Sequence, residues 1–106
     1  MANPSKAKGT KAEVAVERYL RSLGLDADRR PPRGAEDEGD VWCGEWALEV
    51  KAAQTYRTPE WWTETMREAA IAEKRPLLVV KPRGVADPAK YWAICDLRTF
   101  AKYVLL

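Results

Sequence analysis

The chain has 106 residues, of which 46% are hydrophobic and 32% charged, as is typical of a soluble globular protein with one domain. No apolar run approaches the roughly 20 residues needed to cross a bilayer, and no apolar segment of a secretory signal follows the basic start, MANPSKAKGTK. The net charge is only +2, and histidine is absent. Its absence excludes imidazole general bases and imidazole zinc ligands, so any hydrolysis would have to use carboxylates, lysine and a hard metal ion. The two cysteines lack paired spacing, so we expect free thiols, a cytoplasmic protein and no membrane partner.

The charges are distributed unevenly along the chain. Residues 1–11 carry lysines and no acid, residues 36–40 carry four acids and no base, and bases predominate again from 74 to 90. A run of charge is most often a solvated face. Basic flanks around an acidic centre also suit a metal-dependent enzyme that acts on a phosphate backbone.

Apolar spacing and turn residues predict the elements of the first 39 residues. Residues 1–8 are expected to form a flexible arm before a single domain at 9–106. An apolar stripe with helical spacing predicts a helix over 10–23, which Gly24 should close. A short strand over 25–29 should follow. The stretch 29–39 holds two prolines and two glycines and is predicted to be a loop.

The second half alternates strands and helices. We expect a hairpin over 40–44 and 46–53, strands over 76–82 and 90–96, and a short final helix capped by Asp96. Another helix should run from Thr58, as N-cap, to the residues before Pro76. Its core-facing stripe is predicted at Trp62, Met66, Ala69 and Ala70, with Glu73 as a further candidate. The order α-β-β-β-α-β-β-α indicates an α/β (α+β) fold with a central mixed sheet flanked by helices.

The hairpin carries charges in an apolar setting. Successive strand residues point to opposite faces, so Glu49 and Lys51 share one face. A weak exposed ion pair would explain those two residues alone. Asp40, at the start of the partner strand, can reach the same end of the hairpin. Two converging carboxylates suit Mg²⁺, and a lysine beside the ion can orient an attacking water.

The first predicted helix offers another acid. Glu13 lies beside the apolar stripe and can point along the sheet edge toward the hairpin. Glu17 is expected to be an ordinary solvated glutamate.

Together these segments resemble a known family. KGTKAEVAVERYLRSLGLDADR (8–29) is similar to the opening of archaeal-type Holliday junction resolvases. Gly39-Asp40-Val41 and Glu49-Val50-Lys51 resemble the PD-(D/E)xK nuclease core that those resolvases share. The helix at 59–74 and the following RPLLVVKPRG resemble the family's second helix and its "P-x-L-x-V-K" strand. The resemblance covers about residues 8–100.

The resemblance implies a restriction-endonuclease-like core, Mg²⁺ dependence with Mn²⁺ as a substitute, and a homodimer that nicks two strands of a four-way DNA junction. It implies that Asp40 and Glu49 bind the metal, with Glu13 near it and Lys51 as the motif lysine. Val50 would add its backbone carbonyl to the metal. Gln54 stands where related nucleases often carry a polar helper.

The chain departs from the family pattern at two places. The loop Arg29–Gly34 corresponds to the family's mobile loop near the scissile phosphate, and it carries Arg33-Gly34 where the family often has a serine. Gly39 stands where the family usually has a proline before the motif aspartate.

Basic residues around the expected site are candidate phosphate contacts, which would give salt-dependent and largely sequence-independent affinity. Taken singly, each is equally well explained as a solubilising surface charge. They are Lys6, Lys8, Lys11, Arg29, Arg30, Arg33, Arg57, Arg67 and Lys81. Trp46 and Trp92 are expected in the core. Of the adjacent Trp61 and Trp62, one is a candidate dimer anchor or a stacking surface for a base.

The leading hypothesis is therefore a Mg²⁺-dependent, structure-selective DNA endonuclease, most directly a Holliday junction resolvase. One alternative is a nuclease or nickase for flaps, other branched DNA or single strands. An alternative of another class is a non-catalytic DNA-binding module that keeps the fold.

Overall fold

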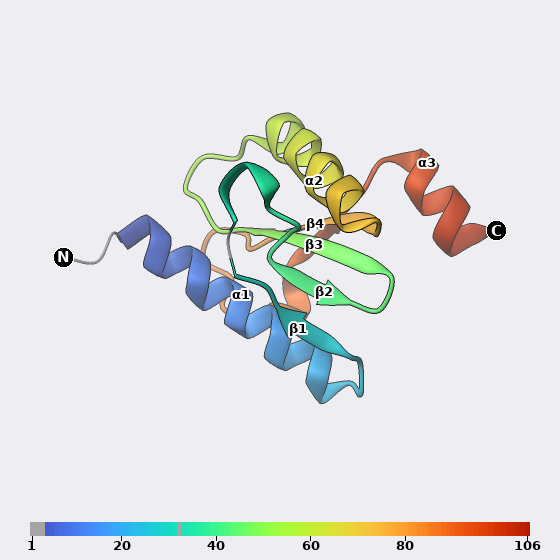
Figure 1. Ribbon diagram of the computed structural model, residues 1–106. Coiled ribbons are helices and arrows are strands. Elements are labelled where there is room, and N and C mark those ends of the chain that lie inside the picture. The colour runs from blue at the N-terminus through green and yellow to red at the C-terminus, as the bar shows by residue number, and fades with distance from the viewer. Residues whose placement is uncertain (1–3, 32) are drawn as a thin grey trace.

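A single five-stranded mixed sheet separates two helical layers (Figure 1). The computed structural model describes residues 4–31 and 33–106, and the backbone alone at 4–6 and 35. The strands are β1 (Ala27–Arg29), β2 (Val41–Cys43), β3 (Trp46–Lys51), β4 (Arg75–Val80) and β5 (Trp92–Ile94). They lie side by side in chain order, and only the β3–β4 pair is parallel. The predicted α+β class with a mixed sheet flanked by helices is confirmed.

Each face of the sheet is covered by one long helix. Helix α1 (Pro4–Ser22) packs its buried Ala12 and Val16 against one face, which β3 lines with Leu48 and Val50. Helix α2 (Thr58–Ala72) covers the other face, where its Trp61 meets Leu78 and Val80. Because side chains alternate along β3, Glu49 and Lys51 must project toward α2. The described residues include no helix that is both long and apolar enough to cross a membrane.

The ends of α1 differ in how well they were predicted. The helix begins at Pro4, six residues before the predicted start at residue 10, so residues 4–8 of the expected arm are helical; residues 1–3 lie outside the described residues. At the other end, the Gly24 N–H donates to the Arg21 carbonyl at 2.9 Å and the Leu25 N–H to the Leu20 carbonyl at 3.1 Å. Gly24 has a φ of 85°, which glycine adopts without steric cost. The predicted glycine stop is confirmed as a Schellman ending.

The buried side of α2 matches the predicted stripe only in part. Ala69 is buried as predicted, but Met66, Ala70 and Glu73 are exposed, and the other buried residues are Trp61, Thr65 and Glu68. Two of the buried positions hold polar residues, which a hydrophobic pattern assigns to solvent. The helix also starts one residue earlier than expected, because Arg57 occupies the N-cap position in place of Thr58.

The C-terminal segment ends the sheet at β5 and then turns away from it (Figure 1). Asp96 caps α3 (Leu97–Phe100), its Oδ1 accepting a hydrogen bond from the Thr99 N–H at 2.8 Å, as predicted. The helix continues as a π-helical turn over Ala101–Leu105. Trp92 was expected in the core but is 50% exposed, because β5 is an edge strand.

Candidate functional site

The four predicted catalytic residues border one cavity. This acidic cavity, with a volume of about 700 Å³, opens between α1, the β2–β3 hairpin and α2. Glu13 reaches it from α1, Asp40 from the start of β2, and Glu49 and Lys51 from β3. Val50 and Arg29 also line it. Three separate elements therefore bring together residues that are as many as 38 positions apart in the sequence, from Glu13 to Lys51.

Asp40 is held rigidly at the mouth of the hairpin. Its backbone N–H donates to the Leu48 carbonyl and its carbonyl accepts from the Arg30 N–H, both at 2.8 Å. Its Oδ2 accepts a hydrogen bond from the Val50 N–H at 2.8 Å. Burial raises the pKa of Asp40, while the Val50 N–H and the charges of Lys51 and Arg29 oppose that rise. The carboxylate is thus fixed in place beside the Val50 backbone.

Gly39 gives the backbone the conformation with which the chain enters β2. Its φ is 98°, and a Cβ there would lie 3.3 Å from the Leu48 carbonyl oxygen. Proline has a φ fixed near about −65° and cannot adopt this conformation. A proline at position 39 would therefore not fit the backbone that positions Asp40.

The Gly39→Ala substitution should cost more stability than the same change at Gly84. Both glycines have positive φ, of 98° and 75°, but a Cβ at Gly84 meets no atom within 4 Å. We expect Gly39→Ala to lower the free energy of unfolding by roughly 1–3 kcal/mol, and Gly84→Ala to lower it by less. Urea unfolding of both variants measures the difference. Equal losses would show that the close approach to Leu48 is unimportant.

Glu49 is buried, which rules out the reading of an exposed ion pair. It is only 5% exposed, and its Oε2 has no hydrogen-bond partner among the described residues. The Lys51 Nζ lies 3.9 Å from Glu49 Oε1 and 3.2 Å from Glu64 Oε2. The ammonium group therefore stands between a strand carboxylate and a helix carboxylate at the wall of the cavity.

Glu13 faces the cavity in company with Arg29. The Arg29 Nη2 lies 3.6 Å from Glu13 Oε1. Burial and the nearby Asp40 carboxylate raise the pKa of Glu13 to about 7, against the opposing charge of Arg29. The expectation for Glu17 was wrong, because its Oε2 accepts a hydrogen bond from the Arg29 backbone N–H at 2.8 Å. Glu17 thereby fastens the end of β1 to α1.

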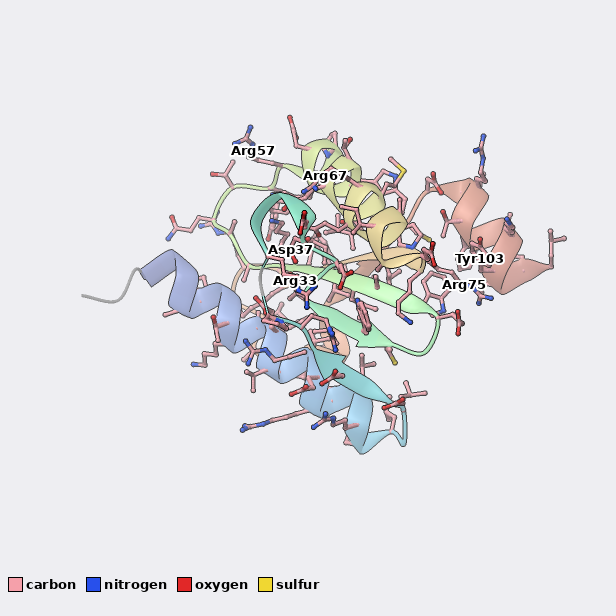
Figure 2. All side chains as sticks on the ribbon, viewed as in Figure 1. Arg33, Asp37, Arg57, Arg67, Arg75 and Tyr103 are labelled. Carbon is pink, nitrogen blue, oxygen red and sulfur yellow. The ribbon has the colours of Figure 1, made fainter. Side chains whose placement is uncertain are left out.

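Sequence reasoning missed three acids that converge on the same region. They are Asp37, from the loop between β1 and β2, and Glu64 and Glu68, from α2; Figure 2 shows Asp37 on that loop. Burial, followed by the charges of Asp37 and Asp40, raises the pKa of Glu68 to about 8. Burial and the nearby Asp40 also raise the pKa of Asp37. The acidic run at 36–40 and the i, i+4 spacing of Glu64 and Glu68 were the available signals.

The chemistry of this donor set fits a hard divalent cation. Three buried carboxylate oxygens, Asp37 Oδ1, Glu49 Oε2 and Glu68 Oε2, have no hydrogen-bond partner among the described residues. Unpaired buried carboxylates are costly, and Mg²⁺ or Mn²⁺ accepts such oxygen ligands readily. Within the described residues, one set of three acids has ligand atoms that all lie within 4.8 Å of one another, namely Glu49, Glu64 and Glu68. Asp40 is outside that set.

Several of the predicted phosphate contacts gather next to the acidic cavity. Lys8 and Lys81 border a neighbouring cavity of about 230 Å³. Gln54, the predicted polar helper, and Arg83, which had not been predicted as a contact, border it too. Ala52 and Ala53 line both cavities, so they are contiguous. Lys11 borders a third cavity, of about 450 Å³, with Lys8 and Lys81.

The remaining predicted bases are less closely tied to the site. Arg30 is engaged elsewhere, since its Nη1 lies 2.9 Å from Asp28 Oδ2 and its guanidinium stacks 4.1 Å above the Trp42 ring. Arg33 and Arg57 are exposed, on the loop before β2 and before α2 respectively (Figure 2). Arg67 lies on α2, 3.9 Å from Glu68. The side chain of Lys6 lies outside the described residues.

Comparison with models of protein families, with curated proteins and with solved structures found no match. The interpretation of the site therefore depends on its own residues. They combine an acidic cavity with unpartnered oxygens, one ammonium group at its wall, and a basic cavity beside it.

Proposed function

We propose that this protein is a Mg²⁺-dependent endonuclease with a restriction-endonuclease-like core that cuts branched DNA, most directly as a homodimeric Holliday junction resolvase. The observation that carries the proposal is the convergence of Glu13, Asp40, Glu49 and Lys51 on one cavity. They form the carboxylate and lysine set that PD-(D/E)xK nucleases use. The unpartnered oxygen of buried Glu49 supports a cation at this place.

Asp40, Glu49 and the Val50 carbonyl would hold the ion, with Glu13 reaching it through water. Mn²⁺ has the same preference for oxygen ligands and should replace Mg²⁺. When bound, the ion supplies Lewis-acid polarisation of the phosphate and a more acidic water. The Val50 N–H keeps Asp40 in position before the ion arrives, so little reorganisation is needed.

Lys51 is the residue that acts on the reacting atoms. Its ammonium can donate a hydrogen bond to the attacking water and offset negative charge on the phosphate. The water oxygen forms a bond to phosphorus and loses a proton to solvent, the bond from phosphorus to the leaving sugar oxygen breaks, and that oxygen takes a proton from solvent. Glu49 and Glu64 hold the Nζ between them, which restricts the long side chain to the cavity wall.

The basic cavity would give a DNA strand a path to the acidic cavity. Lys8, Lys81 and Arg83 border it, and Ala52 and Ala53 connect it to the cavity with Asp40. Small side chains at this connection leave room for a sugar–phosphate backbone. Basic groups on one side and a cation on the other would hold successive phosphates.

The double variant Lys8→Ala/Lys81→Ala should weaken junction binding and reduce its salt dependence. Each lost phosphate contact lowers the slope of log K against log salt by about 1, so a fall of about 2 is expected. Electrophoretic mobility shift at several salt concentrations, in Ca²⁺ to prevent cleavage, measures the slope. Lys102→Ala, an exposed lysine on the C-terminal π-helical turn, is the control. An unchanged slope would place the DNA elsewhere on the surface.

A panel of labelled substrates tests the function itself. A four-way junction, a flap, a single strand and a linear duplex are incubated with the protein in Mg²⁺ or EDTA. Preferential nicking of paired strands in the junction is expected, with a dimer in sizing experiments on the junction complex. Faster cleavage of the flap or single strand would favour the alternative nuclease. Binding of the junction with no Mg²⁺-dependent cut in any substrate would favour the non-catalytic DNA-binding module.

A further inference from the structure

The three glutamates that lie closest together form a second cluster beside the Asp40 site. Glu49 reaches it from β3, while Glu64 and Glu68 come from one face of α2 at i and i+4. One ligand oxygen from each lies within 4.8 Å of the others. Asp40 takes no part in this cluster, which shares only Glu49 with the site proposed above.

Two of these glutamates carry buried oxygens that nothing in the described residues satisfies. The side chains of Glu49 and Glu68 are only 6% and 3% exposed. The Oε2 atom of each is buried without a hydrogen-bond partner. Lys51 approaches Glu49 Oε1 and Glu64 Oε2, and Arg67 approaches Glu68 Oε1 at 3.9 Å, so both contacts leave the two Oε2 atoms unpaired.

Leaving such oxygens unpaired is unfavourable, because a buried acceptor without a partner loses its hydration and gains nothing in return. A cation bound by all three carboxylates would remove this cost. Glu64 has a side chain 37% exposed, which gives a hydrated ion access from solvent. A set made only of carboxylates, with no imidazole or thiolate, suits hard divalent ions such as Mg²⁺ and Mn²⁺.

We propose that Glu49, Glu64 and Glu68 form a second divalent-cation site, which shares Glu49 with the site at Asp40. The proposal concerns cation binding and does not require that the protein cuts DNA. Glu49 would then be a ligand in both sites. If the nuclease proposal holds, this arrangement would give the enzyme two metal ions.

Counting bound Mn²⁺ by electron paramagnetic resonance tests the second site without any nucleic acid. The wild-type protein should bind two ions per chain. Glu64→Gln and Glu68→Gln should each lower the affinity for the ion at the three glutamates at least tenfold. Asp40→Asn should lower the affinity for the ion at Asp40. Glu45→Gln, an exposed glutamate in the hairpin turn, should leave both unchanged. Circular dichroism confirms folding, and Glu64, which is partly exposed, provides a variant outside the buried core.

Other results separate the two sites. A single ion that is lost in Glu64→Gln and Glu68→Gln but retained in Asp40→Asn would support the second site and contradict the one proposed for catalysis. Mn²⁺ binding by Glu64→Gln and Glu68→Gln that equals wild type would overturn the second site, whatever the number of ions bound.

Discussion

Replacing Lys51 by methionine should slow Mg²⁺-dependent cleavage of a four-way junction by roughly 100- to 1,000-fold, the usual cost of removing one donor to a developing charge. Methionine keeps much of the length and the apolar stem of lysine but cannot donate a hydrogen bond. Lys51 stands between Glu49 and Glu64 at the cavity wall, so no other ammonium group in the described structure occupies that place. Single-turnover cleavage with excess protein measures the chemical step.

The affinity of Lys51→Met for the junction shows whether Lys51 acts in cleavage or in DNA binding. Junction affinity in Ca²⁺ should change less than about threefold, because one lost charge has a modest effect on a largely electrostatic interface. Lys102→Met, on the exposed C-terminal turn, should cleave like wild type. Cleavage at the wild-type rate by Lys51→Met would remove the lysine from the mechanism. A loss of affinity as large as the loss of cleavage would make it a binding residue.

The metal-free protein should become less stable as the pH rises from 5 to 8.5. The pKa values of Glu13 and Glu68 are raised from 4.5 to about 7 and about 8, mainly by burial. The folded state therefore holds these protons more tightly than the unfolded chain. Their contribution to stability is complete below about pH 4.5 and is lost as the pH passes through the folded values. One pKa unit corresponds to about 1.4 kcal/mol, so a fall of a few kcal/mol is expected.

Thermal unfolding in EDTA at several pH values measures this dependence. A decrease in Tm on the order of 10 °C between pH 5 and 8.5 is expected for a domain of this size. The Glu68→Gln variant, which carries no ionisable group there, should show a smaller decrease. Added Mg²⁺ should raise Tm more at pH 8.5 than at pH 6, because bound metal requires deprotonated ligands. A flat pH profile in EDTA would contradict the electrostatic description of the cavity.

The sequence was a good guide where the signal was local. Period-2 alternation placed Glu49 and Lys51 on one face of β3, and the structure puts both at the cavity. Gly24 and Asp96 marked helix ends because each satisfies backbone groups within a few residues. Asp40 was predicted from its position at the start of the hairpin, and in the structure its carboxylate accepts a hydrogen bond from the Val50 N–H.

The sequence failed where docking between distant elements decides the outcome. The side of α2 that faces the sheet holds Thr65 and Glu68, and a hydrophobic pattern cannot foresee that a glutamate will be buried beside other acids. Glu17 looked solvated until β1 came to lie against it. Trp92 looked like a core residue because the pattern does not show that β5 is an edge strand.

Cleavage of a labelled four-way junction by the wild-type protein and by Asp40→Asn, in Mg²⁺ and in EDTA, is the most direct test of the central claim. On a denaturing gel, we predict nicked strands for the wild type in Mg²⁺ and intact strands in EDTA. Asp40→Asn should leave the strands intact in both, while still binding the junction. Wild-type protein that binds the junction but leaves every strand intact in both Mg²⁺ and Mn²⁺, or Asp40→Asn that cuts at the wild-type rate, would contradict the proposed nuclease site.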